Sequence, residues 1–248
     1  DVVKGIKKEE KILNLVRKNV SIEIPLWKVC TDDVIISSSI DGISIATPMQ
    51  MQSQMHKFNI DPSNKIFLDS FSKFLIELHS IKYDDIKNSG LETLTVDELR
   101  KNISDDILII KDNWEVSDKL LNRWKSWVDN DDLWPDFFAF THGDLHGAHI
   151  LVDKNQNLKG VLDWSLASYN DISRDFMLYY FTFGEEALDL LLRQYSENGG
   201  KVWKNIKKQI IERMNNYVLI LARFAIKTNI EEYYQNTQDV IDYFENKL

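Results

Sequence analysis

Histidine and aspartate side chains gather in one short stretch in the middle of the chain. Three of the five histidines, His142, His146 and His149, lie within eight residues, and Asp144 stands among them. A further carboxylate, Asp163, follows His149 by fourteen residues. Phosphoryl transfer needs a carboxylate that orients the attacking hydroxyl and accepts its proton, together with ligands for magnesium, which neutralises the phosphate oxygens. The spacing allows one base, Asp144, and two metal ligands, His149 and Asp163, to converge.

The residues around this stretch predict a loop followed by a β-hairpin. The apolar run 150–152 and the run 160–162 read as two strands, and the turn between them is rich in Asp, Asn and Lys. Asp163 ends the second strand. Because a hairpin folds back on itself, we expect it to return Asp163 to the loop that carries Asp144.

Helical periodicity dominates the rest of the chain. We expect an amphipathic helix over 3–18, two short strands at 27–30 and 34–37, and a weakly patterned stretch over 43–64. Further helices are expected over 66–81, within 91–114, from an N-cap at Ser117, over 176–183 and 185–196, as one long helix from about residue 201, and as a short final helix. The predicted class is α+β with a mainly helical large lobe.

Composition excludes several classes of protein. The chain has 248 residues, 44% of them apolar, and a net charge of −9, which disfavours nucleic-acid binding and suits a cationic small molecule. The single cysteine, Cys30, excludes an intramolecular disulfide. No apolar run approaches the roughly 20 residues that a membrane helix needs, and the first residues do not resemble a signal peptide. We therefore expect a cytoplasmic protein without a membrane partner, and a monomer.

The motif resembles the catalytic loop and metal-binding Asp of kinases, written H-G-D-x-x-x-x-H and then D-W in this chain. It is similar to the aminoglycoside phosphotransferase and choline-kinase-like group, and most of all to the macrolide 2′-phosphotransferases. The matching segments are 142–146, 149–151, 160–164, Asp171 and 175–176, followed by 183–185, 199–203, 224–225 and 231–233. The resemblance runs from the first helix to Tyr233.

The resemblance implies a role for each residue of the loop. Asp144 is expected to be the catalytic base for a sugar hydroxyl, and His149 and Asp163 are expected to hold Mg²⁺. Asp171 is expected to support the loop through hydrogen bonds. For His142 we expect a supporting role, as a hydrogen-bond partner of the loop backbone or of Asp163, rather than direct chemistry.

The resemblance also implies two substrate sites. Glu9 is expected to pair with a basic phosphate-binding residue, and the hinge, Ile36, Ser37, Ser38 and Ser39, is expected to meet the base of GTP or ATP. A macrolide is large and apolar, so aromatic side chains are expected to form its site. The candidates for that site are His146, Tyr179, Tyr180, Phe183, Trp203 and Phe224.

The expected fold is a protein-kinase-like two-lobe fold. Residues 1–40 would be the remnant of a truncated N-terminal nucleotide-binding β lobe, with the hinge at about 36–39. Residues 41–248 would form the helical C-terminal lobe. The family has a phosphate-covering loop before the first helix, and this chain contains no G-x-G-x-x-G pattern.

Three alternatives remain open at the sequence level. The acceptor could be another small alcohol, such as an aminoglycoside, choline or homoserine. The chain could be a truncated lobe that binds a ligand without turnover. His142, His146 and His149 could form a zinc hydrolase site, although no Glu follows His142 and Gly143 and Gly147 disfavour a continuous helix there.

Overall fold

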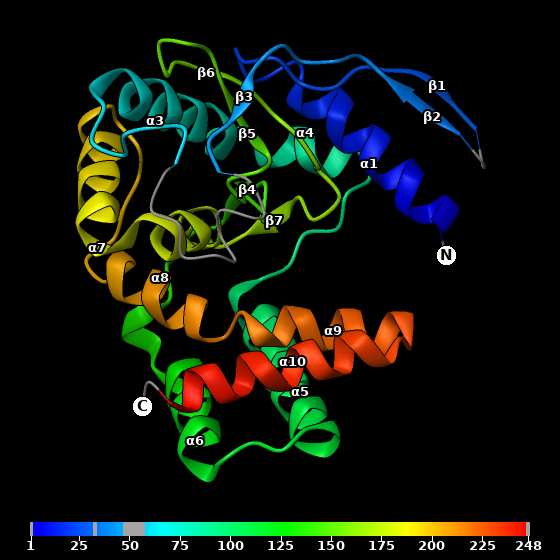
Figure 1. The fold of residues 1–248 in the computed structure, drawn as a ribbon, viewed down its shortest axis with the longest axis vertical. Helices are drawn as coiled ribbons and strands as arrows, with labels where there is room; N and C mark the ends of the chain where they lie inside the picture. The colour runs from blue at the N-terminus through cyan, green and yellow to red at the C-terminus, as the bar shows by residue number, and fades with distance from the viewer. Residues whose placement is uncertain (1, 32–33, 47–57, 247–248) are drawn as a thin grey trace. The chain divides into compact units, whose positions relative to one another are not determined.

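The computed structural model describes residues 2–31, 34–46 and 58–246. The elements, in chain order, are α1 (Val2–Val16), β1 (Trp27–Cys30), β2 (Ile35–Ser37), β3 (Ile43–Ser44), α3 (Lys65–His79), α4 (Tyr83–Asn88), α5 (Val96–Asn113), α6 (Asp118–Asp129), η1 (Asp131–Leu133), β4 (Ala139–Thr141), β5 (Ile150–Val152), β6 (Leu158–Val161), β7 (Ser168–Asn170), α7 (Ser173–Glu197), α8 (Ile206–Asn215), α9 (Val218–Thr228) and α10 (Glu231–Glu245) (Figure 1). Small sheets and a mostly helical C-terminal part confirm the predicted α+β class.

The strands form three small sheets. β1 and β2 pair as an antiparallel ribbon, as the sequence predicted. β5 and β6 form the expected hairpin, with Ile150 opposite Val161, and β3 adds to its other side. The pair β4–β7 was not expected; it places Thr141, at the start of the loop, opposite Ser168. The pair β4–β7 and the sheet β3–β5–β6 therefore hold the two ends of the loop between β4 and β5, which carries the candidate active site.

The chain divides into two compact units. The first combines residues 1–93 with 137–203, and the second combines 94–136 with 204–248. All the strands and the His/Asp motif belong to the first unit. The sequence predicted a boundary near residue 40, between an N-terminal and a C-terminal lobe. The division into these two units does not test that boundary, which stays a prediction.

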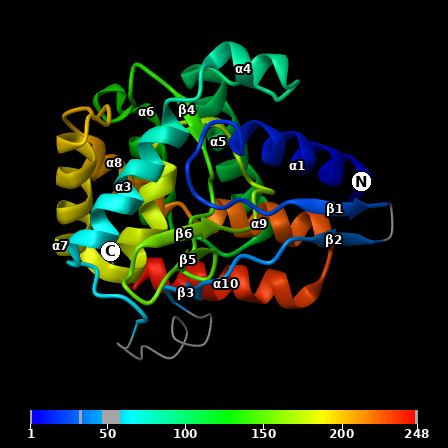
Figure 2. The same ribbon diagram turned by 90° about the horizontal axis from the view of Figure 1, so that it is seen from above.

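In the first unit, α3 packs beside α7 (Figure 2). Asn64 caps α3 by accepting hydrogen bonds from two backbone N–H groups of the first turn. Phe67 stacks on Phe71 and on Tyr179 of α7, and the Phe71 ring is tilted against Tyr179, with ring centroids 5.3–6.3 Å apart. This aromatic core fixes α7, whose first turn lies against the loop of the site.

The second unit is held together by bonds between its two chain segments. α5 begins with a capping box between Thr95 and Glu98, and Ser117 caps α6 as predicted. Within this unit, the indole N–H of Trp127 in α6 donates to Gln209 of α8 at 2.8 Å. Burial of the aromatic side chains of α6 around this bond supplies the core of the unit.

The helix predicted from residue 201 and the break predicted near residue 184 have opposite outcomes. The single long helix from residue 201 was wrong: α8 ends at Asn215, and α9 starts two residues beyond Asn216. The Asn216 side chain donates to the Glu212 carbonyl at 2.8 Å, so it competes with the helical ladder and ends α8. The break expected between 183 and 185 is confirmed, because Gly184 interrupts α7 with φ 82°.

Of the weakly patterned stretch 43–64, residues 47–57 lie outside the described residues. The short strand β3, at its start, was not predicted from the sequence.

Candidate active site

The structure brings Asp144, His149 and Asp163 together at the end of the β5–β6 hairpin. The His149 Nδ1 atom lies 3.7 Å from Asp144 Oδ2, and its Nε2 atom lies 3.8 Å from Asp163 Oδ2. Two tight backbone bonds shape the loop, from the His146 N–H to the Asp144 carbonyl and from the His149 N–H to the His146 carbonyl, both at 2.8 Å. The hairpin therefore returns Asp163 to the loop, as the sequence predicted.

A hydrogen bond sets the orientation of the His149 ring. His149 Nδ1 lies 3.0 Å from the backbone carbonyl of Asp144, which can only accept, so Nδ1 carries the proton. The other ring nitrogen, Nε2, then presents its lone pair on the side of Asp163. Such a backbone partner is the usual way in which proteins fix the tautomer of a metal-binding histidine.

Asp163 and Asp144 have different electrostatic surroundings. Burial opposes ionisation of Asp163, but hydrogen bonds from Ser165 and the charge of His149 outweigh it and hold the pKa of this carboxyl below its usual range. Burial raises the pKa of Asp144, although His149 and His146 act against the rise. Asp163 is thus the more strongly ionised carboxylate, suited to a cation, and Asp144 is the more basic one, suited to accept a proton.

Asp163 has a backbone conformation that favours glycine. Its φ is 56°, and its Oδ1 atom accepts bonds from the Ser165 hydroxyl at 2.6 Å and the Ser165 N–H at 3.3 Å. Aspartate tolerates this region because its side chain can bond to nearby backbone. The turn leaves 48% of the side chain exposed, with Oδ2 on the His149 side. The strain holds an oxygen in an accessible position.

His142 is buried inside the loop. Its Nε2 lies 3.0 Å from the Leu162 carbonyl, and its Nδ1 accepts the N–H of Asp144 at 3.2 Å. Burial lowers the pKa of His142 to about 4, so the ring is neutral at physiological pH. The ring thus contacts the loop backbone and the residue before Asp163, and the supporting role expected of His142 stays a prediction.

Sequence reasoning missed the importance of Asp175, at the start of α7. Its two carboxylate oxygens accept the N–H groups of His142 and Gly143, at 3.0 and 2.7 Å. His79 of α3 donates to the same carboxylate at 3.1 Å and contacts the Tyr195 hydroxyl at 2.9 Å. Burial opposes the charge, but these partners outweigh it and keep the pKa of Asp175 low. The available signal in the sequence was the segment 175–176, which resembles the family.

The Asp171 carboxylate bonds to Ser173, two residues further along the chain. Its carboxylate accepts the N–H and the hydroxyl of Ser173, each at 2.8 Å, at the start of α7. The loop-supporting role expected for Asp171 stays a prediction, whereas the bonds of Asp175 to the loop are direct. His79, the last residue of α3, bonds through its ring to side chains of α7.

Glu9 of α1 lies beside Asp163. It accepts the backbone N–H of Trp164, and burial, together with the charge of Asp163, raises the pKa of Glu9. The expected hinge lies elsewhere in the unit: Ile36 and Ser37 are exposed on β2, and Ser38 forms two bonds with Leu26. The structure thus brings Glu9 to the site by contact, whereas the described bonds of the hinge are to β1 and Leu26.

The aromatic candidates for an acceptor site do not form one cluster. The prediction that Tyr179 forms part of the acceptor site was wrong. Its side chain is 1% exposed and stacks in the core against α3, so it cannot line a site on the surface. Phe183 packs on Tyr179 and Phe58, and Trp203 packs edge-on against Phe137. Tyr180 is half-buried on α7, and His146 is half-buried beside His149, with ring centroids 5.6 Å apart. Phe224 belongs to the second unit, where it is 47% exposed and packs on Tyr233.

The three histidines do not form a zinc site. Both ring nitrogens of His142 are engaged inside the loop, so this ring cannot join His146 and His149 around a metal. Within the described residues, no group of three or more His, Cys, Asp or Glu side chains is arranged to hold a metal ion. Magnesium differs from zinc in this respect, because it usually takes only one or two protein ligands and completes its shell with water and substrate phosphates. His149 Nε2 and Asp163 Oδ2 fit that smaller demand.

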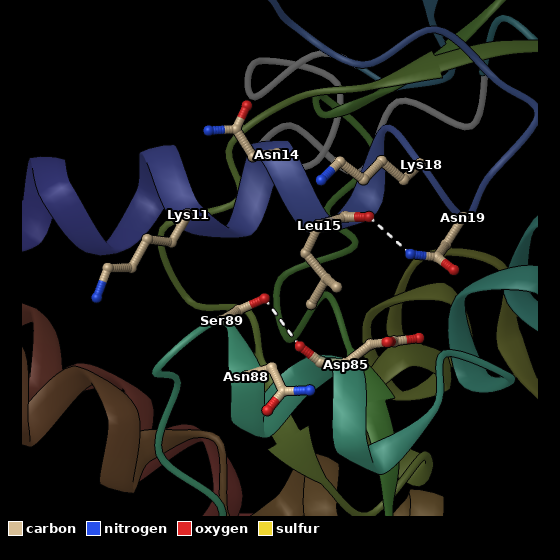
Figure 3. A pocket seen from close by; sticks show the side chains of 8 residues that line it. All are labelled: Lys11, Asn14, Leu15, Lys18, Asn19, Asp85, Asn88 and Ser89. Carbon is tan, nitrogen blue, oxygen red and sulfur yellow. Dashed lines mark hydrogen bonds between the residues drawn. The ribbon is translucent and has the colours of Figure 1, made fainter.

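A separate pocket lies between α1 and α4. It has a volume of about 490 Å³, and polar side chains with Leu15 line it (Figure 3). The lining includes Lys11 and Lys18 of α1 and Asp85 and Asn88 of α4, and none of the predicted site residues. In the described part of the chain, no helix has the length and apolar character that a membrane span requires.

These features define a class of protein. Residues 3–208 match the phosphotransferase enzyme family APH, and the chain belongs to that family. The resemblance to antibiotic phosphotransferases is thereby confirmed. Among curated proteins, the chain is 32% identical over 235 residues to the uncharacterized protein YcbJ of Bacillus subtilis (strain 168), which covers 94% of this chain and 76% of that protein.

Solved structures of antibiotic kinases resemble the chain throughout. A macrolide 2′-phosphotransferase type I has a TM-score of 0.86 and 28% identity, over 95% of this chain and 78% of that one. The macrolide 2′-phosphotransferase MphH of Brachybacterium faecium has a TM-score of 0.85 and 22% identity, over 97% and 81%. The GDP and kanamycin complex of an APH(2″) enzyme has a TM-score of 0.79 and 15% identity, over 98% and 82%. The last two show the fold alone.

Proposed function

We propose that this protein transfers the γ-phosphoryl group of GTP or ATP to the 2′-hydroxyl of the amino sugar of a macrolide antibiotic. The observation that carries the proposal is the convergence of Asp144, His149 and Asp163 within 3.7–3.8 Å contacts at one end of a hairpin. A base and a two-ligand cation site side by side are what phosphoryl transfer to an alcohol requires.

Asp144 is the proposed base. It accepts the proton of the acceptor hydroxyl and orients that oxygen in line with the phosphate. A carboxyl with a raised pKa is a better proton acceptor than an ordinary aspartate, and burial raises the pKa of Asp144. The amino sugar of a macrolide is cationic near neutral pH, so the negative charge of Asp144 also attracts the group next to the reacting hydroxyl.

His149 and Asp163 are the proposed magnesium ligands. His149 offers Nε2, because its Nδ1 proton is committed to the Asp144 carbonyl. Asp163 offers Oδ2, because Ser165 engages Oδ1. When bound, magnesium neutralises charge on the phosphate oxygens. The other coordination positions belong to water and to the nucleotide phosphates.

The macrolide assignment rests on similarity. The C-terminal segments that match macrolide 2′-phosphotransferases and the 28% identity to one of them favour that acceptor over an aminoglycoside. Phosphorylation adds nearly two negative charges at pH 7. We propose that the modified drug no longer fits its ribosomal site, so the enzyme confers macrolide resistance.

Mass spectrometry tests the proposal directly. Erythromycin, kanamycin and choline are incubated with the protein, magnesium and either GTP or ATP, with the chain expressed together with its native flanking sequence. We expect a phosphoryl-group mass gain on erythromycin alone. The matched control is Asp144→Asn, which keeps the shape of the side chain and removes the base. A gain on kanamycin or choline would reassign the acceptor, and no gain on any of the three would support a lobe that binds without turnover.

A further inference from the structure

The first turn of α7 presents a cation to the backbone just before Asp144. Arg174 follows the start of α7 at Ser173, and its Nη1 donates to the Ser168 hydroxyl of β7 at 3.0 Å. Ser168 in turn accepts the Thr141 hydroxyl through its carbonyl, at 3.0 Å. Arg174 is therefore tied to the strand pair that holds the start of the loop.

The guanidinium group of Arg174 lies directly over Gly143. A Cβ atom added to Gly143 would stand 2.8 Å from Arg174 Cζ and 2.7 Å from the Leu166 carbonyl, distances that real Cβ atoms do not show. Gly143 also has φ 83°, which favours glycine. Position 143 therefore has no room for a side chain, because Arg174 and the Leu166 carbonyl occupy the space.

Arg174 and Asp175 hold the same two residues from different sides. Asp175 accepts the N–H groups of His142 and Gly143, while Arg174 covers the Cα of Gly143. Two adjacent residues of α7 thus fix the peptide unit that leads into Asp144. The far side of the loop is held differently, by backbone bonds at His146 and His149 and by bonds from Ala46 and Ser44 to the Gly147 and Ala148 carbonyls.

The charge of Arg174 also acts on the site. Burial raises the pKa of Asp144, and Arg174 is among the groups that oppose the rise, with His149 and His146. Asp163 acts in the other direction. On its outer side Arg174 is close enough to Lys8 of α1 that its charge, after burial, lowers the pKa of that lysine.

We propose that Arg174 is a positioning residue for the phosphoryl transfer: its guanidinium, clamped between Gly143 and Ser168, fixes the backbone that carries Asp144 and supplies a positive charge beside it. This inference rests on the proposed role of Asp144 as the base. Arg174 acts through Asp144 and Gly143 and is assigned no contact with the substrate. The planar guanidinium covers a backbone peptide and hydrogen-bonds to Ser168, and its positive charge acts on Asp144 in a way that a neutral group of the same shape cannot reproduce.

Chemical rescue tests this role in the enzyme. We expect Arg174→Ala to lower kcat about tenfold or more, since small displacements of a base have effects of that size, with KM for both substrates within about threefold of the original values. Added guanidinium ions should restore several-fold of the lost kcat. Urea, which has a similar shape and no charge, should not. Ser168→Ala, which removes the anchor and keeps the cation, should lower kcat less than Arg174→Ala.

Arg17→Met is the matched control. Arg17 is also half-buried and lies in the same unit, and its described hydrogen bonds go to Asn14 and to the Pro25 carbonyl rather than to the loop. This variant makes the same change in net charge, and its kcat should stay within about twofold of the original. Rescue of Arg174→Ala by urea as well as by guanidinium, or an unchanged kcat in Arg174→Ala, would overturn the proposal.

An NMR measurement tests the inference without turnover. The chain contains two His-Gly pairs, 142–143 and 146–147, so labelling histidine with ¹³C at the carbonyl and glycine with ¹⁵N selects the amides of Gly143 and Gly147. His146→Gln removes the Gly147 signal and so assigns the other. We expect Arg174→Ala to shift the Gly143 amide strongly and the Gly147 amide little.

Together, the kinetic and NMR experiments distinguish a failure of the positioning role of Arg174 from a failure of the proposed function. If the unsubstituted protein phosphorylates no acceptor, the proposed function fails, and the Gly143 amide still reports whether Arg174 fixes the loop. An unmoved Gly143 amide in Arg174→Ala would overturn the positioning role even in an active kinase. A shift together with the guanidinium-specific rescue would support it.

Discussion

At the scale of single residues, the candidate site depends on His149, whose ring contacts two carboxylates. His149 stands between Asp144 and Asp163, and its tautomer is fixed by a backbone carbonyl. The two carboxyls differ because Ser165 donates to Asp163, whereas Asp144 is dominated by burial. Their hydrogen bonds and exposure therefore suit similar residue types to the different roles proposed for them, base and metal ligand.

Replacing the proposed base separates chemistry from folding. We expect Asp144→Asn to lower kcat by about 10²- to 10⁴-fold, which is the usual contribution of general base catalysis. The thermal midpoint should change little, since His149 Nδ1 is 3.7 Å from the carboxylate, beyond hydrogen-bond distance, and the side chain is 23% exposed. Phosphoryl transfer to erythromycin and calorimetry measure the two effects. A fully active Asp144→Asn would move the base elsewhere.

His142 should make stability depend on pH. Its pKa is about 4 in the fold, because the ring is buried, against 6.5 ordinarily. Above pH 6.5 the ring is neutral in both folded and unfolded states. As the pH falls from 6.5 to 4, the unfolded state gains a proton and the folded state does not, so the folded state loses up to about 3 kcal/mol of stability.

Urea unfolding of the protein and of His142→Gln, without magnesium, measures this effect. The substituted residue keeps an N–H donor for the Leu162 carbonyl but does not titrate. The difference in unfolding free energy between the two proteins should therefore narrow by about 3 kcal/mol between pH 7 and pH 4. A difference independent of pH would mean that His142 titrates normally in the fold.

At the scale of elements, α7 does more than any other helix to build the site. Its first turn supplies Asp175 and Arg174 to the loop, and its middle packs on α3 through Tyr179. Gly184 then redirects the chain, with φ 82° and ψ −175°, values that only glycine adopts readily. The second half of α7 can thus bring Tyr195 back to His79.

Alanine substitutions at two glycines test this interpretation. Nothing lies within 4 Å of a Cβ at Gly184, so the cost of Gly184→Ala is backbone strain alone, about 1–3 kcal/mol. Gly5 of α1 is equally open but has no positive φ, so Gly5→Ala should be neutral or stabilising by up to about 1 kcal/mol. Chemical unfolding midpoints measure both. Equal effects at the two positions would show that the backbone at Gly184 is not strained by a side chain.

At the scale of the whole molecule, the chain makes two units from four segments. The first contains the sheets, the loop and α7, and therefore all the charged residues proposed for catalysis. The second has its own buried core, in which Trp124 is fully buried and donates to the Asn215 carbonyl at 3.2 Å. Separate cores allow separate stabilities.

A large-to-small change in the second core tests this division. Trp124→Ala should cost about 3–5 kcal/mol. Hydrogen exchange should accelerate in residues 94–136 and 204–248 more than in residues 137–203. The control is Leu108→Ala in the same unit, whose side chain is 59% exposed and whose replacement should change stability by less than about 0.5 kcal/mol. Equal acceleration throughout the chain would show that the two units unfold together.

The sequence by itself determined the motif, its hairpin and the helical class. Asp144, His149 and Asp163 were recognisable because a loop and a two-stranded hairpin are local structures, in which spacing along the chain fixes spacing in space. The first helix, the β1–β2 ribbon and the cap of α6 were predictable for the same reason.

Only the tertiary structure decided what surrounds that motif. Arg174 and Asp175 reach the loop from the first turn of α7, and His79 of α3 reaches Asp175. No local pattern in the sequence records such contacts. Burial likewise decided that Tyr179 belongs to the core. The pKa differences between the two carboxyls came from the same source, because desolvation and hydrogen bonding depend on which distant segments close over a side chain.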